Sequence, residues 1–256
     1  MGEVYRQFPA LFPYLRDTFF ADNSAGRTAM IFLGIITSIA VAYLLGSVNF
    51  GILLSRRIYH DDIRNHGSGN AGTTNMLRVY GKKTAAITLI LDVLKGAAAV
   101  ILGALLASVN GAYIAGFFVV LGHMFPLFFK FKGGKGVATT LGAVIVISPI
   151  VAAILLAVFI IIFLSSHYVS LASVMTALLY PLILNAMNGP GVNVIMAVLT
   201  AGFIVFMHRA NIKRLYHGQE TKTYLRKREE AGTVSADEKK EPKNGPESDG
   251  TDDDKK

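Results

Sequence analysis

The chain has 256 residues, of which 52% are hydrophobic and only 16% are charged, with a formal net charge of +8. Ordinary soluble domains carry about 25% charged residues, so this composition excludes that class. The sequence has no cysteine, which excludes disulfides, a thiolate nucleophile and cysteine metal sites.

Long apolar runs dominate the sequence. No Asp, Glu, Lys or Arg occurs from Gly136 to Met207. A helical span needs about 20 apolar residues, so this segment is long enough to cross a bilayer several times. We therefore expect an all-α polytopic membrane protein. The apolar runs are residues 29–55, 84–108, 112–129, 137–165, 169–187 and 191–207.

The charged loops indicate the orientation of these runs. Basic residues gather in the loops 56–83 and 130–135 and in the region after residue 208. The positive-inside rule places all three on the cytoplasmic side, so an even number of spans must separate Lys135 from Arg209. Proline disfavours helix at the preceding residue, so Ser148-Pro149 divides the run 137–165 in two and gives four spans. The sequence thus predicts seven transmembrane helices, with the N-terminus outside and the C-terminus in the cytoplasm.

Both ends of the chain differ from the middle. The first residues lack an uninterrupted apolar core and contain Pro9 and Pro13, so no cleavable signal peptide is expected. Residues 229–256 contain ten acidic residues and five lysines, and almost nothing apolar, which predicts a disordered acidic tail. We divide the chain into an N-terminal extension (1–28), a membrane domain (29–225) and a disordered tail (226–256).

The first polar motif is GSGNAGTTN at residues 67–75. Glycines allow close approach of backbone N–H groups to a ligand, and a turn leading into a helix N-terminus suits an anionic oxygen. Arg78 follows one turn after Thr74, on the same helical face. The alternative is a flexible loop with a helix N-cap.

The second motif is GGKG at residues 133–136. A nucleotide-binding P-loop requires Ser or Thr after the lysine, whereas Lys135 is followed by Gly136, so we do not expect nucleotide binding. A different phosphate cradle would combine glycine backbone, Lys135 and the following helix N-terminus. A hinge carrying a cytoplasmic lysine is the alternative.

The third motif, HRANIKRLYHGQETK, occupies residues 208–222. A helix would present His208 and Asn211 together, because they are three residues apart. The alternative is a basic interfacial helix that binds anionic lipid headgroups. Within the apolar run 84–108, Asp92 and Lys95 have the same spacing and are expected to form a structural ion pair.

Taken together, the motifs resemble the bacterial acyl-phosphate:glycerol-3-phosphate acyltransferase (PlsY) family. The resemblance runs in order over about residues 29–225. Family members commonly read Gly-Ser-Ile-Pro in the first helix, where this chain has Gly46-Ser47-Val48-Asn49, so the shape of that helix is open. The matching segments are Asp62-Ile63-Arg64, GSGNAGTTNMLR at 67–78, the Asp92/Lys95/Gly96 helix, GHMFPLFFKFKGGKGVATTLG at 122–142, Tyr168-Val169-Ser170-Leu171 and the third motif.

The resemblance implies a multi-pass enzyme of the bacterial inner membrane. Such an enzyme transfers a fatty acyl group from acyl phosphate to the 1-hydroxyl of sn-glycerol 3-phosphate. Its products are lysophosphatidic acid and phosphate, in phospholipid synthesis. The expected partners are these two substrates and membrane lipids, without nucleic acid, and we expect neither a metal nor a cofactor.

The resemblance also assigns site residues, motif by motif. The expected catalytic residues are Ser68, Asn75, Arg78, Lys135, His208 and Asn211. The expected substrate- and phosphate-binding residues are Gly67, Gly69, Asn70, Thr74, Gly133, Gly134, Gly136, Ser170, Ser173, His217 and Glu220.

Acyl phosphate is already activated, so the protein would mainly position the substrates and stabilise charge. The sequence shows no usable Ser/His/Asp set, and we therefore do not expect a covalent acyl-enzyme. The general base stays open between His208 and the substrate's own phosphate. The rival function is an organic-anion transporter with glycine-rich substrate-binding loops, but such proteins often contain internal repeats and this sequence shows none. A lipid-binding scaffold without chemistry is a third possibility.

Overall fold

The computed structural model describes residues 10–223, and the expected tail at 226–256 lies outside this range. Within this range every regular element is helical, which confirms the all-α class. The elements are α1 (Leu11–Phe19), α2 (Ser24–Ser47), α3 (Phe50–Ile58), η2 (Ile63–Asn65), α4 (Thr73–Met124), η3 (Leu127–Phe129), α5 (Val137–Ile147), α6 (Pro149–Ser166), α7 (Val169–Asn188), α8 (Val192–Met207) and α9 (Arg209–Tyr216).

The described helices include four stretches that are long and apolar enough to cross a membrane. A fifth is obtained if α8 and α9, which meet at an angle of 58°, are taken as one bent span. The four stretches are Ser24–Ile58, Thr73–Phe129, Pro149–Ser166 and Val169–Asn188. Helix α5 is apolar but shorter. The chain is therefore a multi-pass helical membrane protein.

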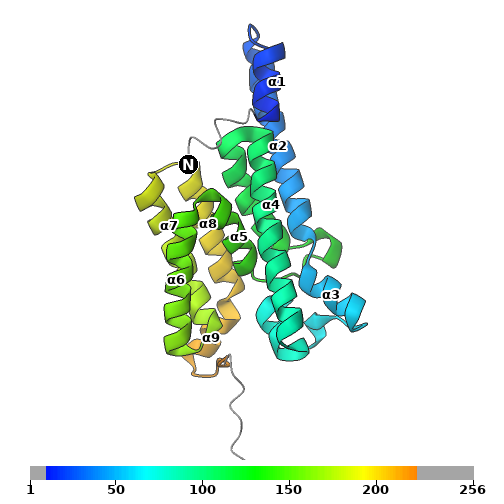
Figure 1. Cartoon of the computed structure of the whole chain (residues 1–256), viewed down its shortest axis with the longest axis vertical. Coiled ribbons are helices and arrows are strands. Elements are labelled where there is room, and N and C mark those ends of the chain that lie inside the picture. The colour runs from blue at the N-terminus through cyan, green and yellow to red at the C-terminus, as the bar shows by residue number, and fades with distance from the viewer. Residues whose placement is uncertain (1–9, 224–256) are drawn as a thin grey trace, which may run out of the picture. The chain divides into compact units, whose positions relative to one another are not determined.

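Helix α4 contains a chain reversal. The backbone leaves helical geometry at Gly81 and again at Ala107 and Ser108. Across the second break, a Cβ atom on Gly103 would lie 2.5 Å from the carbonyl oxygen of Gly111, so the two backbones touch. Figure 1 shows the resulting hairpin within the ribbon labelled α4. Its arms, residues 82–106 and 109–124, correspond to the two apolar runs expected at 84–108 and 112–129.

Two other breaks define the remaining helices. The run 137–165 divides at Ser148, whose backbone is extended, and Pro149 is the first residue of α6, as the sequence predicts. The run 29–55, whose shape at Gly46–Asn49 the sequence leaves open, divides into two helices. Helix α2 ends at Ser47, and the Asn49 side chain accepts a hydrogen bond from the Ile52 N–H (3.1 Å) and caps α3. This asparagine produces the break without the family's proline.

The N-terminal boundary also differs from the expectation. Helix α2 begins at Ser24, inside the segment 1–28 that was set apart as an extension, and α1 precedes it. The Asn23 side chain accepts a hydrogen bond from Gly26 N–H (3.0 Å), which fixes the start of α2 earlier than the apolar run suggests. Helices α3 and α9 lie toward the end of the bundle opposite α1 (Figure 1).

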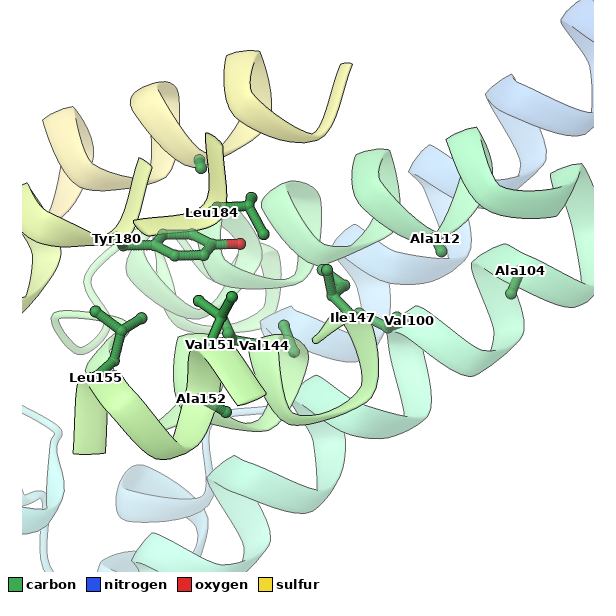
Figure 2. Packing of buried hydrophobic residues seen from close by; sticks show 12 residues of the cluster. Val100, Ala104, Ala112, Val144, Ile147, Val151, Ala152, Leu155, Tyr180 and Leu184 are labelled. Carbon is green, nitrogen blue, oxygen red and sulfur yellow. The ribbon is translucent and has the colours of Figure 1, made fainter. Parts of the chain in front are cut away.

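A buried apolar core joins α4, α5, α6 and α7. Tyr180 and Leu184 of α7 lie over Val144 and Ile147 of α5, and Val151 of α6 packs between them (Figure 2). This core fixes α5 and α6 against α7, and so sets the walls of the cavity described below.

Glycines let the helices approach closely. A Cβ on Gly96 would lie 2.2 Å from the carbonyl oxygen of Thr139, and one on Gly142 would lie 1.9 Å from that of Val93. Apolar packing against lipid gives helices little reason to associate, so close contact through small residues matters more in a membrane than in water. These contacts hold α5 against the first arm of α4.

We predict that Gly96→Ala destabilises the protein, whereas Gly202→Ala does not. The added methyl group at Gly96 meets backbone that cannot move aside, at a cost of about 1–3 kcal/mol or more. At Gly202 nothing lies within 4 Å of the added Cβ. Thermal unfolding in detergent measures the difference, and equal melting temperatures for the two variants would contradict the packing assigned to α4 and α5.

Candidate active site

A cavity of about 600 Å³ lies where the three polar motifs meet. Its walls come from the loop before α4, from α4, α5, α6 and α7, and from the end of α8 and the segment after it. The predicted convergence of the motifs is therefore present in the structure. The predicted residues that line the cavity are Gly67, Ser68, Asn70, Thr74, Asn75, Arg78, Lys135, Gly136, Ser170, Ser173, His208, Asn211 and Glu220.

The loop before α4 is organised by Asn75, which is only 2% exposed. Its side-chain nitrogen donates to the carbonyl oxygens of His66 and Asn70 (2.9 Å each), and its oxygen accepts from the Ser68 N–H (2.9 Å). These bonds occupy the amide, and through them the side chain holds Ser68 and Asn70 at the cavity wall. Asn75 also lines the cavity, and its catalytic role stays a prediction.

Arg64, which forms an ion pair within this loop, also contacts the segment just before the second motif. Asp62 accepts hydrogen bonds from Arg64 (2.7 Å) and Arg56 (2.8 Å). Arg64 also donates to the carbonyl oxygens of Phe129 (2.9 Å) and Lys132 (3.0 Å). The hydrogen bonds from Arg64 and Arg56 hold the pKa of the Asp62 carboxyl well below its usual range, despite opposition from partial burial. Arg64 therefore links the residues just before the first glycine-rich motif to those just before the second.

The N–H groups of Gly133 and Gly134, two residues that were expected to bind phosphate, are bonded within the protein. The Gly133 N–H donates to the carbonyl oxygen of Met124 and the Gly134 N–H to that of His123, both at 3.1 Å. A Cβ on Gly134 would lie 2.1 Å from Nε2 of His123. These glycines therefore fix the loop against the end of α4, and neither lines the cavity.

Gly136 begins the part of the loop that faces the cavity. Its φ of 82° lies in the left-handed region that glycine favours, and it turns the chain into α5. The first backbone bond of α5 runs from the Thr140 N–H to the Gly136 carbonyl (2.8 Å), so the preceding N–H groups have no helical partner. Because Val137 and Ala138 line the cavity, α5 directs its positive end there.

A buried charge cluster lies behind this loop. The predicted ion pair is present, with Lys95 Nζ 2.9 Å from Asp92 Oδ1. Lys95 also donates to Nδ1 of His123 (2.8 Å) and to the carbonyl oxygen of Val48 (2.9 Å). Asp92 and His123 also line the cavity. The cluster connects the end of α2 to both arms of α4 and, through His123, to the Gly134 backbone.

Lys135, Asn211 and Glu220 form a hydrogen-bonded chain across the cavity. The Lys135 ammonium donates to Oδ1 of Asn211. The Asn211 Nδ2 group donates to Glu220 Oε1 (2.6 Å), as does the Ser170 hydroxyl (2.8 Å). Arg214 donates to the other Glu220 oxygen (2.7 Å). The lone acid of the third motif thus orients residues from the second motif, α7 and α9.

Burial and neighbouring groups shift the pKa values of Lys135 and Glu220, two members of this hydrogen-bonded network. Burial lowers the pKa of Lys135 to about 8, and the charges of Arg214 and Arg78 act in the same direction while Glu220 opposes them. Burial raises the pKa of Glu220, but hydrogen bonds from Asn211, Ser170 and Arg214 outweigh it, so the net pKa is lowered. An anion in the cavity would face Arg78, Lys135 and Arg214, and the two carboxylates that line the cavity, Glu220 and Asp92, are already paired with donors.

His208 has a defined hydrogen-bonding role. Its Nδ1 lies 2.8 Å from the carbonyl oxygen of Ile204, and a carbonyl can only accept, so Nδ1 carries the proton in the neutral ring. Nε2 is then the acceptor. The side chain is almost completely buried and lines the cavity. The residue can therefore accept a hydrogen bond or a proton from a bound hydroxyl.

Two further predictions are not supported by this geometry. Gly69 does not line the cavity, because its N–H bonds to the His66 carbonyl inside the loop (3.0 Å). His217 is exposed, and its Nδ1 lies 2.8 Å from the carbonyl oxygen of Lys213, away from the cavity. Because His217 follows the last residue of α9, its side chain does not share the helix face that carries Asn211.

Sequence reasoning missed several cavity residues. Arg214 lies three residues after Asn211 and so shares its face of α9, a spacing that could have identified it. Thr73, Asp92, His123 and Tyr180 also line the cavity, and only the folded chain brings them there. Among residues 10–223, no group of three or more His, Cys, Asp or Glu side chains is arranged to hold a metal ion.

Comparison with known proteins identifies the family. Residues 36–218 match the family described as glycerol-3-phosphate acyltransferase. The chain belongs to the glycerol-3-phosphate acyltransferase family. The match covers the first two polar motifs and most of the third, and most of the residues that line the cavity.

Individual relatives are similar over most of their length. The glycerol-3-phosphate acyltransferase of Thermoanaerobacter pseudethanolicus is 45% identical over 189 residues, which are 73% of this chain and 94% of that protein. That of Carboxydothermus hydrogenoformans is 44% identical over 193 residues, or 75% and 98% of the two chains.

Two solved structures share the fold. The crystal structure of PlsY, an integral membrane glycerol 3-phosphate acyltransferase, in its glycerol 3-phosphate form has a TM-score of 0.71 and 40% identity, covering 74% of this chain and 96% of that one. The lysophosphatidic acid form has a TM-score of 0.68 and 38% identity, covering 74% and 95%.

The lowered pKa of Lys135 predicts a pH dependence. The charged ammonium exists below its pKa, so kcat/KM for a phosphate-bearing substrate should fall as the pH rises through about 8. A bound phosphate favours the charged form, so the corresponding fall in kcat should occur at higher pH. The Lys135→Arg variant, which keeps its charge, should lose the fall in kcat/KM near pH 8. An unchanged fall in that variant would contradict the assignment to Lys135.

Proposed function

We propose that this protein transfers a fatty acyl group from acyl phosphate to the 1-hydroxyl of sn-glycerol 3-phosphate and releases lysophosphatidic acid and phosphate. One observation carries the proposal: a single cavity joins a cationic, hydroxyl-rich end to an apolar end. Both substrates carry a phosphate, and the donor also carries a long hydrocarbon chain. The solved relatives in glycerol 3-phosphate and lysophosphatidic acid forms support the same substrate class.

The polar end has the groups that two phosphates require. Arg78 at the start of α4 and Lys135 just before α5 supply positive charge, and Arg214 adds a third cation. The starts of α4 and α5 direct free N–H groups to the same space. Charged donors bind phosphate oxygens more strongly than neutral ones do, so these side chains would hold the substrates and stabilise the departing phosphate.

The apolar end suits the acyl chain. It is lined by Leu141 and Val144 of α5, Leu155 of α6 and Ala177 of α7. Two further lining residues, Leu89 and Leu156, are also exposed at the outer surface, at 41% and 42%. Since they lie on the first arm of α4 and on α6, the apolar end would open to lipid between these helices. A donor dissolved in the bilayer would enter there.

The reaction would be a direct transfer. The 1-hydroxyl oxygen attacks the acyl carbon, the bond between that carbon and the phosphate oxygen breaks, and inorganic phosphate leaves. The hydroxyl proton passes either to Nε2 of His208 or to a substrate phosphate. The protein would contribute mainly orientation and charge stabilisation, because acyl phosphate is already activated.

We also propose seven membrane-spanning helices in the bacterial inner membrane, with the N-terminus outside and the C-terminus in the cytoplasm. Seven apolar helices support this count: α2, the two arms of α4, α5, α6, α7 and α8. Helix α5 has 11 residues and would span only with the help of its neighbours. Helices α3 and α9 and the basic loops would lie on the cytoplasmic side.

The chemistry is tested by glycerol-3-phosphate-dependent phosphate release from acyl phosphate by the purified protein. Lys135→Ala should reduce turnover by on the order of 100-fold or more, because a charge-assisted contact to phosphate is lost. Arg78→Lys should recover only part of the activity lost in Arg78→Ala, since lysine cannot make a bidentate contact. Lys82→Ala and Arg57→Ala, outside the cavity, are the matched controls and should stay within a few-fold.

Three results would count against the proposed function. Near wild-type turnover by Lys135→Ala at saturating donor would show that the glycine-rich segment is only a hinge. Equal or faster acyl transfer from acyl-CoA or acyl carrier protein than from acyl phosphate would show that the donor is wrong. Uptake of glycerol 3-phosphate into proteoliposomes without chemistry would favour the transporter.

The topology is tested with single cysteines, which the native chain lacks. Lys132→Cys and Lys213→Cys place a thiol at exposed positions, one just before the second motif and one in the third. Asn110→Cys places one at an exposed position at the start of the second arm of α4, next to the break at Ala107 and Ser108. A membrane-impermeant thiol reagent added to intact cells should label only the cysteine at position 110. Labelling of position 132 or 213 from outside would reject this arrangement.

A further inference from the structure

Helix α7 lines the cavity along its whole depth. Ser170, Ser173, Ala177 and Tyr180 face the cavity at intervals of three or four residues, the repeat of one helical face. Ser170 lies at the polar end, where it bonds Glu220. Tyr180 is ten residues further along the helix, which corresponds to about 15 Å at 1.5 Å per residue. Helix α7 thus runs from the reacting groups to the far end of the apolar region.

Tyr180 closes that far end. Its ring is only 6% exposed and packs in the core with Leu184 of α7 and Val144 of α5 (Figure 2). Val144 is likewise the cavity residue of α5 that lies furthest from Lys135 along the chain. For a donor whose phosphate lies at the polar end, these two side chains are therefore the last contacts along α7 and α5.

A second, smaller void of about 10 Å³ lies behind this wall. It is lined by Tyr113, Met196 and Thr200 on its far side. Thr140, Val144 and Tyr180 line both the cavity and this void. Removing the Tyr180 ring would therefore extend the apolar end into space that is already partly empty.

We infer that Tyr180, supported by Val144, determines the longest acyl chain that the protein accepts. This inference rests on the proposed function. A donor whose terminal methyl reaches the ring fills the apolar end, and each further methylene must enter a closely packed core. The tyrosine would then act by its bulk, so phenylalanine at this position should preserve the limit.

The test is the dependence of kcat/KM on chain length, with saturated acyl phosphates of 12 to 20 carbons and purified protein. The wild type should show a limit beyond which kcat/KM drops by about 10-fold. Tyr180→Ala should move this limit to longer chains while leaving the KM for glycerol 3-phosphate within about two-fold. Val144→Phe, which fills the end of the cavity, should move it to shorter chains. Tyr180→Phe should match the wild type.

Leu184→Ala is the matched control, because Leu184 is fully buried in the same core but lines neither the cavity nor the void. It should lower the melting temperature and leave the chain-length limit unchanged. An unchanged limit in active Tyr180→Ala and Val144→Phe proteins, or an equal shift in Leu184→Ala, would overturn the inference alone. A wild type that does not consume acyl phosphate would instead overturn the proposed function, and this inference with it.

Discussion

The ammonium group of Lys95 is buried among apolar helices and holds several parts of the protein together. A charge in a membrane-spanning helix is costly unless it is paired. The residues around this ammonium group must therefore supply its hydrogen-bond and ion-pair partners. It contacts Asp92 and His123 on the two arms of α4 and the carbonyl oxygen of Val48 at the end of α2. Removing any one of these partners would leave a buried charge or polar group incompletely compensated.

The consequence for the site follows through His123. Its ring packs against Gly134, and its carbonyl accepts the Gly134 N–H, so the loop before Lys135 cannot move independently of the cluster. Lys135 is then held at Asn211, which in turn contacts Glu220. In this way a charge pair that serves packing also orients the cation we assign to phosphate. The buried cation Lys95 and the cavity cation Lys135 are different groups, but His123 and Gly134 connect them through contacts and the backbone.

Local sequence signals predicted most of the helical framework. Apolar runs located the helices, Pro149 located the division between α5 and α6, and the spacing of Asp92 and Lys95 predicted their ion pair. The boundary between α2 and α3 was missed because the cap is a single Asn49 within an apolar run. A cap depends on one side-chain hydrogen bond, which hydrophobic periodicity does not reveal.

Within the site, residue types were predicted better than residue roles. Charged and hydroxyl side chains of the three motifs do line one cavity. The hydrogen-bond partners of Asn75, Gly133 and Gly134 could not be predicted, because the folded loops and the end of α4 set them. Tyr180 belongs to none of the three sequence motifs. Its position at the end of the cavity depends on how α5 and α7 pack, which a single sequence does not specify.

The central claim is that transfer to the acceptor hydroxyl in this cavity begins with attack on the acyl carbon and releases the phosphate with its bridging oxygen. The most direct measurement uses acyl phosphate with ¹⁸O in the oxygen that bridges the acyl carbon and phosphorus, with glycerol 3-phosphate as acceptor and mass spectrometry of the products. Direct attack on the acyl carbon breaks its bond to the bridging oxygen, so the label should appear in inorganic phosphate and be absent from lysophosphatidic acid. Label retained by the acyl group, as free fatty acid or ester, would show that the phosphorus–oxygen bond breaks instead and would contradict the account.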